Sequence, residues 1–242
     1  RMWGYFFNKG IVEPVDDFRA HNPSTHPNLL DTLARYFRDN GHDLKKLIRI
    51  IVQSKTYQLS SHPNHSNEAD FINYSHALPR PLDAEVLLDA ISQVSGVPEV
   101  FYDNFETQGG QPPIGTRSIN LKTPVRYRSP FLDMYGRPMR YAVPERDSDA
   151  SLEQALHLYA GRVYTTKLVQ GKGWIDQVLE NGESDEAIIE ELYLSALSRF
   201  PNREEQLALQ SQLEVMQTSP RKQALADLLW AVITSREFTH NH

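Results

Sequence analysis

Residues 131–162 read FLDMYGRPMRYAVPERDSDASLEQALHLYAGR, and this stretch decides how the chain divides. From Val97 to Pro144, which includes the first part of this stretch, glycine and proline interrupt every short apolar run, which is typical of irregular chain. Downstream of it, apolar residues recur with the 3.6-residue period of an amphipathic helix. The stretch therefore marks the passage from a half rich in loops to a half that is helical.

Helix-start signals divide the C-terminal half into short segments. Four apolar runs are each preceded by a helix-start signal. Such a residue either accepts hydrogen bonds from the first helical turn or, in the case of proline, presets its backbone. The signals are Ser151 with Gln154, Ser184, Asn202 with Glu205, and Ser219 with Pro220. We expect residues 151–242 to form a bundle of four or five short antiparallel helices. We also expect residues 151–236 to fold as a helical unit without the preceding loop.

The N-terminal part is predicted to be helical as well. Four helical segments are expected there: residues 1–8, 29–37, 44–52 and 82–94. Asp43 is the expected N-cap of the third segment, whereas Gly10 and Gly96 are expected to end the first and the last. The paired helices leave more apolar surface than they can cover on each other, so we expect the four segments to share one core.

These elements predict a mainly α fold of two helical layers or subdomains, joined by a long, largely irregular loop. A small β-hairpin is expected within that loop, from residues 117–121 and 125–127. The predicted division is an N-terminal helical part over residues 1–96, a connector over 97–150 and a C-terminal bundle over 151–242. We expect them to form one compact unit, the C-terminal part of a longer protein, because the chain starts abruptly at Arg1 with aromatic residues.

Composition excludes several classes of protein. Hydrophobic residues make up 40% of the 242 residues and charged residues 23%, which is the range of globular domains. The absence of cysteine excludes disulfides, zinc-thiolate sites, a covalently attached c-type haem in this segment and a cysteine nucleophile. No apolar run reaches the ~20 residues of a membrane span. A net charge of −6 argues against nucleic-acid binding.

Charge is unevenly distributed along the chain. Six basic residues stand against one acid between Arg117 and Arg140, whereas ten acids stand against two arginines between Asp176 and Glu214. One interpretation is that these charges pair within the fold or face solvent. The other is that the basic loop binds an anionic ligand.

The opening stretch holds the densest set of paired charges. Its arginines are Arg137, Arg140, Arg146 and Arg162, and its acids are Asp133, Glu145, Asp147, Asp149 and Glu153. The first interpretation is that these arginines and acids form a structural network of ion pairs that holds the loop in place, since buried charges require partners. As a site, the same stretch offers Glu145, Asp147 and His157 as catalytic candidates, and Arg137, Arg140, Arg146 and Gln154 as ligand-binding candidates.

Two groups of histidines carry further hypotheses. His62, His65 and Glu68 have the side-chain types of metal ligands, but Pro63 and the surrounding loop composition oppose a rigid site, so no metal is predicted. His157 is predicted either to be an interior histidine or to face a cleft beside the charged stretch. The glycine-rich loops that bind nucleotides and the serine-hydrolase elbow are missing from the sequence.

The order of the motifs resembles the planctomycete C-terminal domain of unknown function fifteen-fifty-three. The similar stretches are RMWGYFFNKGIVEPVDDF, THPNLLDTLARYFRDNGHDLKKLIRIIVQSKTYQLSS, RPLDAEVLLDAISQVSG, FLDMYGRPMR, SLEQALHL and LLWAVITSREFTHNH. The resemblance implies a large exported protein of the periplasm or cell envelope, with cytochrome-c-like, haem-bearing domains upstream. The family commonly has a cysteine near the position of Val143 or Pro144, and this chain has none.

These observations favour a non-catalytic interaction domain that docks to upstream domains of its own polypeptide or to another envelope protein. The first alternative is a hydrolase, possibly acting on glycans, that uses the Glu/Asp/Arg/His cluster. The second is an accessory domain of a haem-containing electron-transfer protein, with no cofactor in this segment. A concave pocket lined by Glu145, Asp147 and His157 would favour the enzyme.

Overall fold

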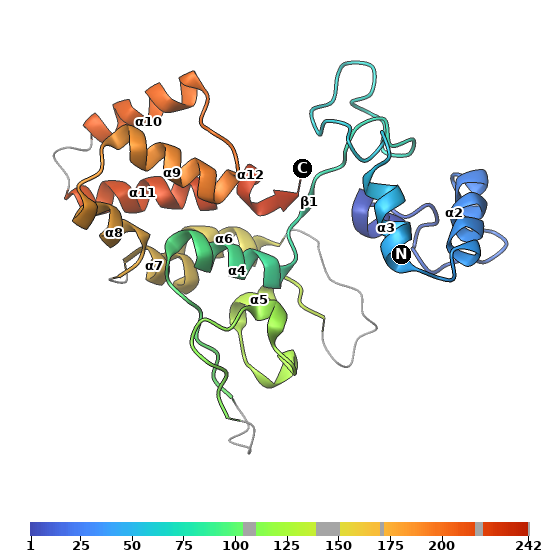
Figure 1. Ribbon diagram of the computed structural model, residues 1–242, viewed down its shortest axis with the longest axis horizontal. Coiled ribbons are helices and arrows are strands. Elements are labelled where there is room, and N and C mark those ends of the chain that lie inside the picture. Colours follow the sequence, from blue (N-terminus) through green and yellow to red (C-terminus); the bar gives the residue numbers. More distant parts are fainter. Residues whose placement is uncertain (104–109, 139–150, 170–171, 216–219, 242) are drawn as a thin grey trace. The chain divides into compact units, whose positions relative to one another are not determined.

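The computed structural model describes residues 1–103, 110–138, 151–169, 172–215 and 220–241. The structure is mainly helical with one small two-stranded sheet, so the predicted fold class is confirmed (Figure 1). The chain divides into two compact units, one of residues 1–80 with Asn241 and the other of residues 81–240. We call them unit 1 and unit 2. This division differs from the predicted one, which placed residues 81–96 with the N-terminal part.

Unit 1 contains three helices, α1 (Met2–Phe7), α2 (Pro27–Asp39) and α3 (Leu44–Val52). Asp43 caps α3 as predicted, because its carboxylate accepts hydrogen bonds from the backbone N–H groups of Lys45 and Lys46. The end of α1 differs from the prediction. Asn8, not Gly10, adopts the left-handed conformation there, with φ 58°. Asparagine tolerates this region better than most residues because its short side chain hydrogen-bonds locally.

The core of unit 1 is aromatic. Its buried members are Trp3, Phe7, Ile11, Leu47, Ile51 and Tyr74, and α2 packs Leu29, Leu30, Leu33 and Phe37 against them. The rings of Trp3 and Phe7 stack at a centroid distance of 4.0 Å. The segment over residues 82–94 takes no part in this core, so the expected core of four shared segments is wrong. Rings from α1 and Tyr74 cover the hairpin of α2 and α3 instead.

Unit 2 contains most of the helices of the chain. Their bounds are α4 (Ala84–Ser95), η1 (Ser118–Asn120), η2 (Pro124–Arg126), α5 (Pro130–Met134), α6 (Leu152–Ala160), α7 (Arg162–Val169), α8 (Trp174–Asn181), α9 (Asp185–Leu197), α10 (Arg203–Val215), α11 (Arg221–Ile233) and α12 (Arg236–Thr239), η denoting a 3₁₀-helix. Strand β1 (Arg80–Pro81) pairs with β2 (His240–Asn241).

Helix α4 is the central element of unit 2. It contacts η1, α5, α7, α8 and α9, and its Leu88 and Ile91 are fully buried in the core that these helices share (Figure 1). Gly96 ends α4 with φ 68°, as predicted. A Cβ atom at Gly96 would lie 2.9 Å from the backbone nitrogen of Trp174. Only glycine therefore permits both this turn and the close approach of α8.

Three of the four predicted helix starts in the C-terminal half are confirmed; of the fourth, Ser219 lies outside the described residues, and Pro220 is the N-cap of α11, not a residue of its first turn. Ser151 and Gln154 form the reciprocal capping box of α6, and Ser184 accepts a hydrogen bond from the N–H of Ala187 at the start of α9. Asn202 and Glu205 exchange hydrogen bonds of 2.8 and 2.9 Å at the start of α10. Helices α7 and α8, which were not predicted individually, bring the bundle to more than the expected four or five.

Residues 97–138, which we call the loop region, belong to unit 2. The predicted hairpin is wrong, because residues 118–120 and 124–126 form 3₁₀-helices. A single β-bridge joins Asp103 to Tyr127 instead. The buried carboxylate of Asp89 on α4 accepts hydrogen bonds from the N–H groups of Ser118 and Ile119, at 2.7 and 3.4 Å. The first N–H groups of a helix have no partner within the helix, so these contacts supply acceptors for them and attach the loop region to α4.

Candidate functional site

A cleft of about 390 Å³ lies in unit 2, between the loop region and the helices α6 and α7. Residues 97–102 and 128–131 of the loop region line it. His157 of α6 and Lys167 of α7 line it from the helical side. We call it the unit-2 cleft. One of the sequence-predicted catalytic candidates, His157, therefore lines a cavity.

Local contacts at both ends of α6 position His157. The side chain of Gln154, besides its part in the capping box, donates a hydrogen bond of 3.0 Å to the carbonyl of Met134 at the end of α5. The indole N–H of Trp230 donates a 2.9 Å hydrogen bond to the carbonyl of Leu158. A side chain at Gly161 would overlap the His157 ring and carbonyl. Glycine is therefore required for the chain to turn from α6 into α7 around this ring.

The imidazole of His157 is enclosed by three aromatic rings. Its centroid lies 5.5 Å from those of Phe131 and Tyr164 and 5.8 Å from that of Tyr135, in edge-to-face arrangements. Burial lowers the pKa of His157 and raises the pKa values of Tyr135 and Tyr164. The imidazole is therefore neutral near pH 7. Among the described residues, its buried Nδ1 atom has no hydrogen-bond partner.

An ion pair forms part of the cleft wall. The ammonium of Lys167, only 5% exposed, lies 3.1 Å from the Glu99 carboxylate and donates a 2.8 Å hydrogen bond to the carbonyl of Val97. Arg128 and Tyr102 also line the cleft, and both are exposed. The charges of Lys167 and Glu99 cancel each other, so the charge of Arg128 makes the described part of the cleft positive overall.

This arrangement can bind a ligand more readily than it can catalyse hydrolysis. The described lining holds one carboxylate, that of Glu99, and Lys167 already pairs with it. Hydrolysis of a glycoside commonly needs two carboxyl groups on either side of the bond. A histidine that acts as a general base is normally oriented by a partner on its other nitrogen. His157 has no such partner in the described part of the chain.

The other predicted site residues have different outcomes. Arg137 forms an ion pair with Asp133 at 2.6 Å and donates a 3.0 Å hydrogen bond to the carbonyl of Tyr127. This is the loop-pinning role expected of the structural network. Glu153 is exposed at the start of α6. Five other residues of the charged stretch lie outside the described residues: Arg140, Glu145, Arg146, Asp147 and Asp149. The side chain of Arg162 is not described either.

The weak metal candidates His62, His65 and Glu68 are exposed in the loop that follows α3. Over the described ranges, no three residues of metal-ligating type lie close enough to hold an ion. Sequence reasoning did not find Glu99 and Lys167 as a pair. No short-range pattern marks them, since most of the loop region and α6 separate Glu99 from Lys167 along the chain. Their juxtaposition depends on how α7 packs against α4.

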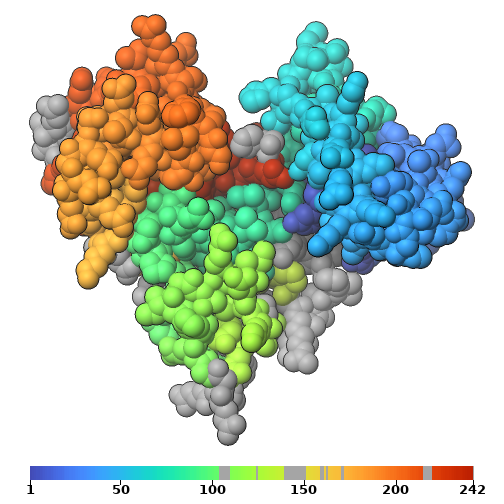
Figure 2. Space-filling model, in the orientation of Figure 1, coloured from blue at the N-terminus to red at the C-terminus, as the bar shows by residue number. Residues whose placement is uncertain are grey.

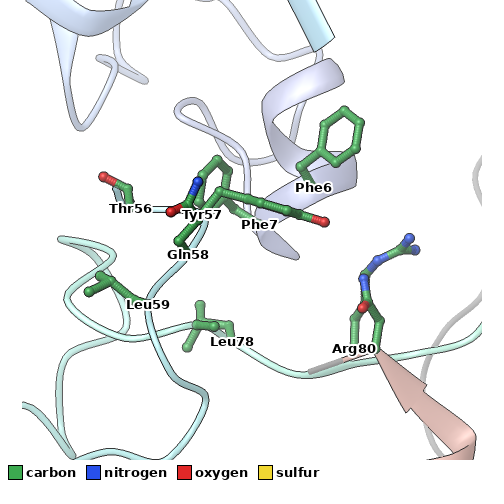
Figure 3. A pocket seen from close by; sticks show the side chains of 10 residues that line it. Phe6, Phe7, Thr56, Tyr57, Gln58, Leu59, Leu78 and Arg80 are labelled. Carbon is green, nitrogen blue, oxygen red and sulfur yellow. The ribbon is translucent and has the colours of Figure 1, made fainter. Parts of the chain in front are cut away.

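Unit 1 has a smaller pocket, of about 260 Å³ (Figure 3). Its lining combines the α1 rings of Phe6 and Phe7 with the segment Thr56–Leu59 and with Arg80. We call it the unit-1 pocket. Sequence analysis did not predict it, although the aromatic cluster at residues 3–7 was evident.

Comparison with known proteins gives one match. A family described as "PSD1: Protein of unknown function (DUF1553)" matches residues 1–213. No curated protein and no solved structure matches the chain. None of the described helices is both long and apolar enough to span a bilayer.

Proposed function

The chain belongs to the PSD1 family of proteins of unknown function, DUF1553, and from this premise we propose that it is a non-catalytic interaction module of a larger exported protein. The module docks to upstream domains of its own polypeptide or to another protein of the cell envelope. The loop region of unit 2 is the docking element, and its partner presents an acidic surface.

The charge balance of the loop region carries this proposal. Its described acids are all paired with cations of unit 2: Glu99 with Lys167, Asp103 with Arg126, and Asp133 with Arg137. Three exposed cations remain, Arg117, Lys122 and Arg128, for which no ion pair is found among the described residues. The loop region thus has a surplus of positive charge on a chain whose net charge is −6. Complementary charge of this kind steers association with an acidic partner.

Exposed apolar side chains lie in the same region. Four of its large apolar residues have relative exposures of 46–74%: Tyr102, Ile114, Ile119 and Val125. Figure 2 shows the described loop region, coloured green to lime, as a lobe of unit 2. Arginine and aromatic residues are enriched in protein–protein interfaces, where such apolar side chains lose water. A partner side chain can also enter the unit-2 cleft, whose rim holds Tyr102 and Arg128.

The alternatives have less support. A hydrolase needs an oriented acid and base, and the described part of the unit-2 cleft offers a neutral histidine and a carboxylate already paired with lysine. Nothing in the described residues favours an accessory role beside a haem domain. The interaction module is therefore the function that the geometry supports best.

The test is a binding measurement between this domain and the upstream part of its polypeptide, produced separately. We expect saturable binding that weakens as ionic strength rises, because surface charges are screened. The triple variant Arg117→Glu, Lys122→Glu, Arg128→Glu should weaken binding by about a hundredfold. A matched triple variant on unit 1, Lys45→Glu, Arg49→Glu, Lys55→Glu, changes the net charge equally and should bind as the wild type does.

Two results would refute docking through the loop region. One is equal binding by the two triple variants. The other is that the wild-type domain binds neither the upstream part of its polypeptide nor any purified envelope protein that carries cytochrome-c-like domains. In the native full-length protein, cross-linking between the loop region and upstream residues gives an independent check.

A further inference from the structure

The lining of the unit-2 cleft is largely apolar. Phe101 and Phe131 are 4% and 2% exposed and belong to the core of unit 2, so the core holds them in place. The imidazole of His157 is half-buried, and Tyr102 is 61% exposed. These last two rings are therefore the aromatic surfaces that a ligand can reach. Valine and proline side chains make up the rest of the apolar lining: Val97, Pro98, Val100, Pro130 and Val163.

Three polar side chains of this lining already have partners. Lys167 and Glu99 form an ion pair with each other, so neither charge is available to a ligand. The hydroxyl of Ser129 accepts a 3.3 Å hydrogen bond from the N–H of Leu132 and thereby caps α5. Because Glu99 is the one carboxylate of the described lining, an anion in the cleft meets no unpaired negative charge there.

Four other polar side chains of the lining are not engaged by the protein. They make no hydrogen bond and no ion pair with the described residues: Tyr102, Arg128, His157 and Thr166. Arg128 is exposed, so its guanidinium can bind a ligand without giving up an ion pair. Tyr102 and Thr166 each add a hydroxyl that can donate a hydrogen bond. One cation and two donors thus lie around a largely apolar cavity.

We propose that the unit-2 cleft binds a small aromatic acid, whose ring packs against Tyr102 and His157 and whose carboxylate binds Arg128. The planar guanidinium has donors that match the two oxygens of a carboxylate. Aromatic rings add a geometric preference for a ring over an aliphatic body of similar size. A lining that is positive overall disfavours cationic ligands.

The size of the cleft agrees with a ligand of this kind. Its volume of about 390 Å³ lies in the range of small-molecule pockets and admits a body of one or two rings. A small-molecule site goes beyond docking. Its test uses no partner protein, so the two proposals can fail independently of each other.

Two pairs of probes separate the contributions of charge and ring. 2-Naphthoate and 2-naphthamide share a ring system and differ in charge, whereas benzoate and cyclohexanecarboxylate share a charge and differ in aromaticity. Binding to the whole chain is measured by calorimetry and by shifts of backbone amide resonances. We expect 2-naphthoate to bind at least about tenfold more tightly than 2-naphthamide, since hydrogen bonds between charged groups contribute more than neutral ones. Benzoate should bind about threefold more tightly than cyclohexanecarboxylate.

Three variants test the assignment of residues. Arg128→Gln should bring the affinities for 2-naphthoate and 2-naphthamide to within about threefold of each other, because the charged donor is lost. Val100→Trp places a larger side chain in the cleft and should weaken binding of all four probes by at least about tenfold. Arg203→Gln removes an equal charge from the exposed start of α10 and should leave every affinity unchanged. Circular dichroism checks that each variant is folded.

Amide resonances give the location of binding. Those perturbed by 2-naphthoate should belong to residues 97–102 and 128–131 and to α7, and shifts confined to other residues would overturn the proposal. Equal affinities within either pair of probes would overturn it as well. So would the absence of saturable binding of 2-naphthoate, or a preference for 2-naphthoate over its amide that survives in Arg128→Gln.

Discussion

The ammonium of Lys167 lies 3.1 Å from the carboxylate of Glu99, and the same ammonium donates a hydrogen bond to the carbonyl of Val97. Lys167 belongs to α7, whereas Val97 and Glu99 begin the loop region directly after α4. The pair therefore attaches the first residues of the loop region to the helical core. It also fixes one wall of the unit-2 cleft.

Removing the lysine should destabilise unit 2. In Lys167→Met, the Val97 carbonyl and the Glu99 carboxylate both lose their partner, and we expect the free energy of unfolding to fall by about 2 kcal/mol. The double variant Lys167→Met, Glu99→Gln should recover part of this loss, because no unpaired carboxylate remains. Urea unfolding measures both. A double variant no more stable than Lys167→Met would show that the pair is not the cause.

His157 should make stability depend on pH. Burial lowers its folded-state pKa below the ordinary value of 6.5, so between the two pKa values the unfolded chain binds more protons than the folded chain. The free energy of unfolding must therefore rise with pH across this window and fall on acidification. We expect the wild type to lose more stability than His157→Phe between about pH 7 and about pH 5. The control His62→Gln, in an exposed loop, should follow the wild type.

Arg199 should resist replacement by lysine. Its guanidinium contacts Glu237 at 2.6 Å and Glu205 at 2.7 Å, and thereby joins the loop after α9 to α10 and α12. A lysine cannot reproduce these paired contacts, so Arg199→Lys should lower the free energy of unfolding by about 1 kcal/mol, a modest value because the side chain is partly exposed. Arg203→Lys, on the exposed start of α10, is the matched control. Equal unfolding midpoints for the two variants would contradict the prediction.

Fragments should show that α4 is required by the C-terminal helices. The sequence predicted that residues 151–236 would fold alone, but Leu88 and Ile91 of α4 are fully buried in the core that α7, α8 and α9 share. We therefore expect residues 81–241 to give a cooperative thermal transition by circular dichroism, and residues 151–241 to give a broad one. A sharp transition for the shorter fragment would restore the original prediction.

The sequence by itself determined where several helices begin and where α4 ends. Asp43, Gly96 and the pair of Ser151 with Gln154 act on backbone groups a few residues away, so their effect can be predicted without knowing the fold. Apolar periodicity likewise determined the fold class. Of the candidate site, the sequence placed Arg137 and Asp133 in one charged stretch and offered a cleft as one of two environments for His157.

Only the tertiary structure decided which helices share a core and which side chains meet. The sequence placed residues 82–94 with the N-terminal hairpin, but an apolar stripe does not specify which partner covers it, and α4 packs in unit 2. Asp89 accepts a hydrogen bond from the N–H of Ser118 at the start of η1, and Glu99 pairs with Lys167. In both cases the two residues are far apart in the sequence. Such contacts depend on the packing of whole helices, because the side chains concerned are brought together only when α4, α7 and the loop region are in place.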